Sequence, residues 1–134
     1  MSEDLNQLRD AIDRLDSEIL QALAKRMQLS DQVIAAKKGA FTFRPGREAA
    51  LVRQLVANSK ANGLDLSPAV ILGVWRQIMA ASLSRQNGDL AVAVHPSVMP
   101  AAAWHMGSAL VATHHDQLDL LLAMVASGQC RYAL

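Results

Sequence analysis

Apolar residues recur every three or four positions in the N-terminal part of the chain, the spacing of one helix face. This stripe contains Leu5, Leu8, Ile12, Leu15, Ile19, Ala22, Leu29 and Val33. Arg26 takes the position between Ala22 and Leu29. A guanidinium among apolar side chains is costly unless an anion meets it. Lys37, eleven residues further on, projects from nearly the same face.

Glycine and proline divide this part of the chain into three predicted helices. The helices are expected over about residues 3–38, 45–63 and 68–87, with a connecting loop over 39–44. Proline opens the second and third helices, and Ser67 is the expected cap of the third. The first helix would be about 50 Å long. A seam of that length without a partner in the same chain implies dimerisation.

The hydrophobic period changes after Asn87-Gly88, a strong turn signal. Residues 1–88 are therefore predicted to be a helical domain, and residues 89–134 an incomplete α/β segment. In the second part, strands are expected over 90–95, 109–113 and 131–134, with helices over 100–106 and 117–127. A βαβαβ order implies a largely parallel sheet. The last strand stops abruptly, which predicts that the native protein continues.

Composition narrows the class of protein. The chain has 134 residues, a net charge of +1, 51% hydrophobic and 4% aromatic residues. The near-zero charge disfavours nucleic acid as a partner. No apolar run approaches the ~20 residues that span a bilayer, and the polar start does not resemble a secretory signal. A single cysteine, Cys130, fits a reducing compartment. We therefore expect a cytoplasmic protein.

Polar residues also end the apolar stripe of the third helix, where Ser82 and Gln86 follow Ile78. Polar groups aimed inward from several helices indicate a pocket for a small anion. Arg9 and Arg26 lie about 25 Å apart along one helix, too far for one metabolite to reach both. If two such helices pair antiparallel, Arg9 of one subunit approaches Arg26 of the other, which predicts two composite sites per dimer.

Residues 5–86 resemble the all-helical (type II) chorismate mutases. The matching positions are the run from Leu8 to Asp16, then Arg26, Lys37, the Arg47-Glu48 pair after Pro45, Ser82 and Gln86. The resemblance implies a mostly α fold, with three helices per subunit interlocked in a homodimer. It also implies rearrangement of the dianion chorismate to prephenate in aromatic amino acid biosynthesis, without a cofactor or metal.

The resemblance also implies roles for individual residues. Arg26 and the partner subunit's Arg9 would clamp the two carboxylates, while Lys37 and Gln86 would donate to the ether oxygen. Glu48 would accept from the ring hydroxyl. Arg47 and Ser82 would complete the carboxylate and hydroxyl contacts. Arg44 departs from the pattern, because some relatives carry an acid there that contacts the ring hydroxyl.

Six of these residues also have a plain structural interpretation. Arg9 can pair with Asp13 one turn away, Lys37 and Glu48 can favour helix dipoles, and Ser82 can bond to a preceding carbonyl. Arg26 can extend its head to solvent, and Gln86 can be a polar helix end. Two other functions stay open: an isochorismate-pyruvate lyase on the same scaffold, and a non-catalytic helical dimerisation or regulatory module.

The C-terminal part has weaker signals. A metal site at His114, His115 and Asp116, joined by His95 and His105, is disfavoured. Asp116 is the expected N-cap of the next helix, and adjacent strand residues point in different directions. Residues 115–134 resemble the first lobe of prephenate dehydratases, with a Ser-Gly-Gln turn between a helix and a strand. The motif of an active dehydratase is absent, so no dehydratase activity is expected.

Overall fold

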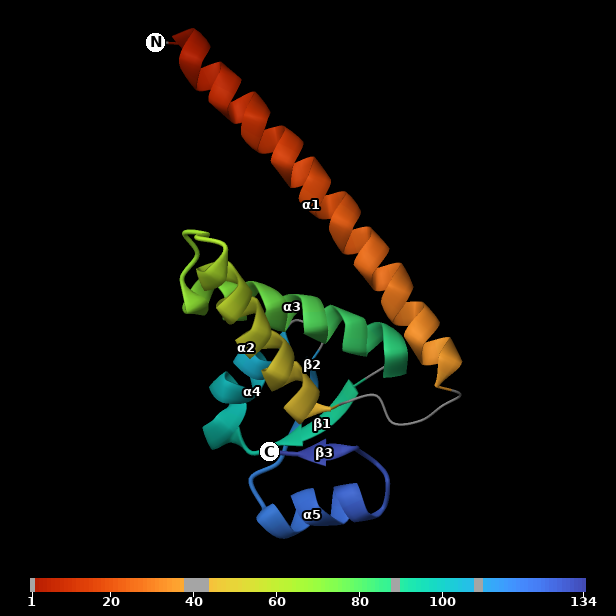
Figure 1. Ribbon diagram of the computed structural model, residues 1–134. Helices are drawn as coiled ribbons and strands as arrows, with labels where there is room; N and C mark the ends of the chain where they lie inside the picture. Colours follow the sequence, from red (N-terminus) through yellow and green to blue (C-terminus); the bar gives the residue numbers. More distant parts are fainter. Residues whose placement is uncertain (1, 38–43, 88–89, 108–109) are drawn as a thin grey trace. The chain divides into compact units, whose positions relative to one another are not determined.

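The N-terminal part of the protein is one long helix. The computed structural model describes residues 2–37, 44–87, 90–107 and 110–134, and it separates into two compact units, Met1–Ala40 and Phe41–Leu134. In the first unit, α1 runs over Ser2–Ala36, which confirms the predicted long helix (Figure 1). Its apolar stripe is not buried: Leu8, Ile12 and Ile19 are 56% to 64% exposed.

The second unit begins with a pair of contacting helices, α2 (Pro45–Ala61) and α3 (Pro68–Asn87). Gly63 ends α2 in the left-handed region, with φ of 65°. There the Leu64 N–H donates to the Ser59 carbonyl, the pattern of a Schellman motif. Ser67 caps α3 as expected, because its Oγ accepts from the Val70 N–H at 3.3 Å. The predicted loop over 39–44 lies outside the described residues except for its last position.

The remainder of the second unit is a small α/β arrangement. Strands β1 (Leu90–Val94), β2 (Leu110–His114) and β3 (Tyr132–Ala133) form a parallel sheet in the order β2-β1-β3. Between them lie η1 (Pro96–Val98), α4 (Met99–Met106) and α5 (Leu118–Ala126). The predicted parallel βαβαβ order is confirmed.

Two helix starts differ from the sequence prediction. The first crossover begins at Pro96 rather than near Pro100, because the His95 Nδ1 accepts from the Ser97 N–H and starts a 3-10 turn. The cap residue of α5 is Gln117, so the expectation that Asp116 caps this helix is wrong. The backbone turns into the helix one residue later than the short polar side chain suggested.

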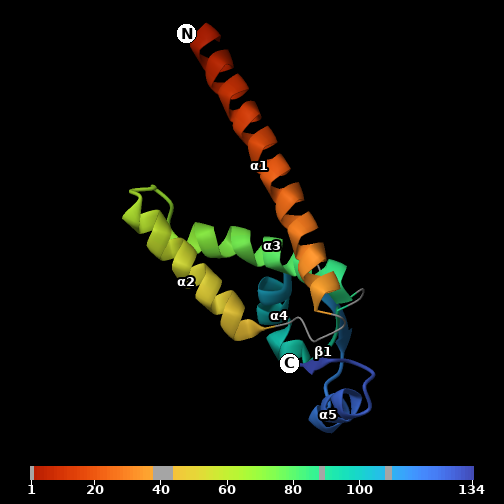
Figure 2. The same cartoon turned by 45° about the vertical axis from the view of Figure 1, so that its right-hand side comes forward.

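Helices cover both faces of the sheet (Figures 1 and 2). On one face, Val92 and Val94 of β1 pack with Leu83 of α3 and with two residues of α4, Ala102 and Met106. On the other face, Ala93 packs with Leu121 and with the buried Cys130. Because α3 contributes to the sheet's core, α2, α3 and the α/β part form one unit. The predicted boundary at residue 88 remains a prediction.

Gly107 marks a close approach between α4 and α3. It ends α4 with φ of 63° and ψ of −157°. A Cβ atom at this position would lie 2.7 Å from the Gln77 Oε1 and 3.0 Å from the Ala80 Cβ. Glycine is therefore required here both by the backbone conformation and by the space.

Across the described ranges, none of the helices combines the length and the apolar character needed to span a membrane.

Candidate active site

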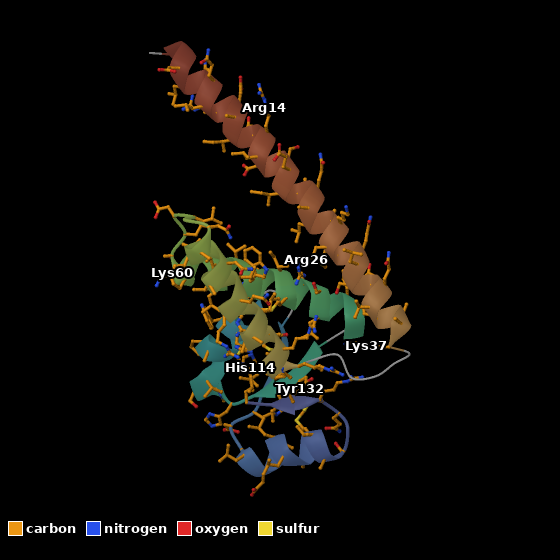
Figure 3. All side chains as sticks on the ribbon, viewed as in Figure 1. Arg14, Arg26, Lys37, Lys60, His114 and Tyr132 are labelled. Carbon is orange, nitrogen blue, oxygen red and sulfur yellow. The ribbon has the colours of Figure 1, made fainter. Side chains whose placement is uncertain are left out.

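Three of the predicted cations belong to the first unit. Arg9 is exposed on the N-terminal half of α1, whereas Arg26 is half-buried. Lys37 directly follows the helix, and its N–H donates to the Val33 and Ile34 carbonyls at 3.1 and 3.0 Å. Figure 3 labels Arg26 and Lys37 in the C-terminal part of this element.

The continuity of α1 sets how these cations can act. Arg9 and Arg26 lie on one unbroken helix, so the rise per residue separates them by about 25 Å along its axis. One subunit cannot place both guanidinium groups on one small dianion. A site in which both Arg9 and Arg26 contact the substrate therefore needs Arg9 from a second chain.

The other predicted residues belong to the second unit. Arg44 is the exposed N-cap residue of α2, and Arg47 is exposed in the first turn of the same helix. Glu48 is largely buried beside them, with 18% of its side chain exposed. The start of α2 thus presents two cations at the surface and one carboxylate directed into the unit.

Glu48 forms an ion pair that was not predicted from the sequence. The Nη1 of Arg76, on α3, donates to the Glu48 Oε2 at 3.1 Å. The same nitrogen lies 3.5 Å from the Nε2 of His105, on α4. Arg76 was missed because it falls beside the apolar stripe of its helix. A signal was present, since Arg76 is the only charged residue between Pro68 and Ser84.

Burial controls the titration of this cluster. Burial raises the pKa of Glu48, and the charge and hydrogen bond of Arg76 lower it in part. Burial also lowers the pKa of His105, and the charge of Arg76 lowers it further. The pKa of Tyr132 is raised overall, mainly by burial. The charge of Arg131 opposes this shift, and the charge of Glu48 adds to it. The charges of the ion pair therefore reach two other elements: Arg76 acts on His105 of α4, and Glu48 acts on Tyr132 of β3.

The two polar candidate residues of α3 are Ser82 and Gln86. Ser82 is buried, and its Oγ donates to the Ile78 carbonyl one turn earlier at 3.0 Å. This contact is the structural interpretation considered for a serine at this position. Gln86 lies in the last turn of α3, and its side chain falls outside the described residues.

The histidines of the C-terminal part form no cluster typical of a metal site. Among the described residues, no three His, Cys, Asp or Glu side chains are placed to hold one ion. His95 instead contacts Ser97, with 2.7 Å between Nδ1 and Oγ. His105 contacts Arg76.

Comparison with known families gives the assignment of the helical part. The family model described as chorismate mutase type II matches residues 8–87. This match covers more than half of the chain. The chain belongs to this family. The predicted resemblance is confirmed, and with it the assignment to a family of isomerases with an all-helical catalytic scaffold.

One relative of this chorismate mutase family member is the T-protein of Enterobacter agglomerans, which is 30% identical over 102 residues. The matched region covers 75% of the present chain and 27% of that protein. The chain thus spans about a quarter of the length of this relative. No solved structure gives a significant match. The resemblance of residues 115–134 to prephenate dehydratases remains a prediction.

Proposed function

We propose that the protein is a chorismate mutase, which converts chorismate to prephenate. The family match over residues 8–87 is the observation that carries this proposal. It contains every candidate residue, from Arg9 to Gln86, in the order expected. The reaction breaks one C–O bond and forms one C–C bond within a single molecule, so no group or proton has to leave.

The candidate residues suit such a reaction. Fixed donors aimed at the breaking ether oxygen stabilise the charge that develops there, and we assign this role to Lys37 and Gln86. A flexible dianion must also be held in a reactive shape. Arg26 and the partner subunit's Arg9 are assigned to its carboxylates, because the planar guanidinium can donate two hydrogen bonds to one carboxylate.

The remaining roles belong to the second unit. Glu48 is assigned to the ring hydroxyl of the substrate, and Arg47 and Ser82 complete the contacts. Arg44, at the cap of α2, adds a cation where some relatives place an acid. It thus adds to the positive charge available for a dianion.

The proposal includes a homodimer. Leu8, Ile12 and Ile19 belong to an apolar stripe that is exposed along a 35-residue helix. Burial of such a surface against a second copy is strongly favourable. An antiparallel pair would also bring the partner subunit's Arg9 toward Arg26, which a single helix cannot do.

The test is product identification with a matched pair of variants. The purified protein is incubated with chorismate and, separately, with isochorismate, and products are followed by NMR. We expect prephenate from chorismate. Arg26→Ala should lower kcat/KM by about 10²-fold, because the substrate carboxylate loses a group that holds the molecule in its reactive shape. Arg26→Lys should also have low activity, since lysine keeps the charge but lacks the planar guanidinium that can donate two hydrogen bonds to one carboxylate.

Arg14→Ala is the control, because Arg14 is an exposed cation on the same helix (Figure 3). It should retain wild-type turnover. Pyruvate and salicylate from isochorismate alone would instead identify a lyase. If neither substrate reacts, the dimerisation module becomes the better explanation.

A further inference from the structure

Arg76 lies at the junction of three elements of the second unit. Its Nη1 is 3.1 Å from the Glu48 Oε2 on α2 and 3.5 Å from the His105 Nε2 on α4. The Arg76 and Glu48 side chains are only 12% and 18% exposed. In such surroundings an unpaired charge is costly, so each member of the pair depends on the other.

The chemistry of arginine fixes the role of His105. A guanidinium stays protonated in proteins, and it has donors but no acceptor. The Nη1 carries two hydrogens, of which one meets the Glu48 carboxylate. The second hydrogen can be donated to the His105 Nε2, 3.5 Å away, only if that nitrogen carries no proton. The imidazole is then neutral, with its proton on Nδ1. Neutral His105 therefore supports the orientation of Arg76, whereas a protonated ring would repel it.

The geometry leaves Glu48 able to bind a second group. Within the described part of the chain, its hydrogen bond to Arg76 uses Oε2. An ionised carboxylate has lone pairs on both oxygens, so Oε1 can accept from a hydroxyl. One oxygen is thus held from inside the protein while the other is available to a ligand.

We propose that Arg76 is a positioning residue that fixes the Glu48 carboxylate for the substrate hydroxyl, and that His105 holds Arg76 in place. This inference rests on the proposed function. His105 belongs to the α/β segment formed by residues 90–134, here called the C-terminal segment. The C-terminal segment is therefore part of the support of the mutase site.

A double-mutant cycle tests whether Arg76 acts through Glu48. Wild type, Arg76→Met, Glu48→Gln and the double variant are compared in the full chain with chorismate. We expect Arg76→Met to lower kcat/KM about tenfold or more, because it removes a hydrogen bond to a charged group. In the Glu48→Gln background the same change should have little further effect. An equal loss in both backgrounds would overturn the proposal.

Two further variants separate positioning from folding. Arg76→Lys keeps a cationic donor and should recover part of the activity. Arg53→Met removes an exposed arginine of α2, and it should match wild type in activity and in melting temperature. If Arg76→Lys is as impaired as Arg76→Met while both remain folded, the carboxylate is not held by charge, and the proposal fails.

The carboxyl titration of Glu48, followed by NMR, does not depend on turnover. Arg76 lowers the pKa of Glu48 against the effect of burial, so Arg76→Met should raise that pKa further, and Arg53→Met should leave it unchanged. No change in Arg76→Met would overturn the ion pair. Absence of prephenate with the wild-type protein would refute the proposed function. The titration would still show whether Arg76 and Glu48 form an ion pair.

His105 is tested with leucine and glutamine. His105→Leu removes the acceptor and should lower kcat/KM severalfold, whereas His105→Gln keeps an acceptor and should lose less. The control is His114→Leu, at an exposed position of β2. If His105→Leu behaves like His114→Leu, the C-terminal segment does not support Arg76, and that part of the proposal is wrong.

Discussion

At the residue scale, two groups with shifted pKa values, Glu48 and His105, both contact Arg76. Its ion pair with Glu48 is buried, and a buried pair costs most when only one partner is removed. This property makes Glu48→Gln and Arg76→Met informative singly and together. It also means that small changes in protonation near Arg76 affect both stability and the site.

His105 gives the protein a pH-dependent stability whose sign follows from its pKa. Burial and then Arg76 lower this pKa below the ordinary value of about 6.5. As the pH falls below 6.5, the unfolded chain gains a proton at this position before the folded protein does. Stability from neutral His105 is therefore present above that pH and is lost as the pH falls toward the depressed pKa.

Melting temperatures at pH 7.5 and 5.5 test this dependence. Wild type and His114→Gln should lose more stability on acidification than His105→Gln. The comparison between variants is needed because Glu48 titrates with the opposite sign: its raised pKa makes stability fall as the pH rises above about 4.5. Tyr132, near Glu48, titrates well above this range. Equal losses in all three proteins would contradict a neutral His105.

The sequence identified most of the candidate charged residues but not their partners. Arg26 could be singled out because it interrupts an apolar stripe, a signal carried by spacing alone. Arg76 could not be paired with Glu48, because they lie 28 positions apart and meet only when α2 and α3 contact. The partnership with His105 depends in addition on how α4 packs against α3.

At the scale of the elements, α1 combines the strongest sequence signal with the least burial. If its stripe forms the dimer seam, the double change Ile12→Asp with Ile19→Asp should give monomers. Each isoleucine contributes about 1.5–3 kcal/mol when fully buried, so two charges in their place should prevent pairing. Sedimentation or light scattering measures the mass. Ser17→Asp, on the opposite face, should remain dimeric, and monomeric wild-type protein would contradict the seam.

The end of α4 depends on Gly107. Gly107→Ala should destabilise the protein by about 1–3 kcal/mol, since alanine would be held in a glycine-only backbone region and crowd Gln77 and Ala80. Urea denaturation measures the change. Gly73→Ala is the matched control: Gly73 is exposed in α3, with open space around its Cβ position. That change should stabilise by about 0.5–1 kcal/mol.

Element ends were predictable where a single residue determines them. Position 63 has a positive φ that favours glycine, and the Ser67 side chain accepts from the Val70 N–H in the first turn of α3. The start of the first crossover helix was missed because a histidine nitrogen, not a serine or aspartate, accepts the capping bond. A histidine cap is a matter of ring orientation, which helix periodicity does not reveal.

At the scale of the molecule, α3 serves two groups of neighbours. One part of its surface contacts α2, and Leu83 enters the core on one face of the sheet. The change of hydrophobic period after residue 88 predicted the switch from helix to strand correctly. It could not show that both sides of the switch share a core, because apolar residues do not specify which neighbours they bury against.

The position of β1 in the sheet has a consequence for synthesis. β1 is the central strand, and both of its neighbours come later in the chain, β3 starting only at Tyr132. At about 5–20 residues per second, the ribosome leaves Val92 and Val94 without a completed sheet for seconds after they are made. During that interval α3 is already available to cover them, since Leu83 precedes them and packs on the same face. The helix thus shields the newly made strand from other chains before the sheet that finally holds it exists.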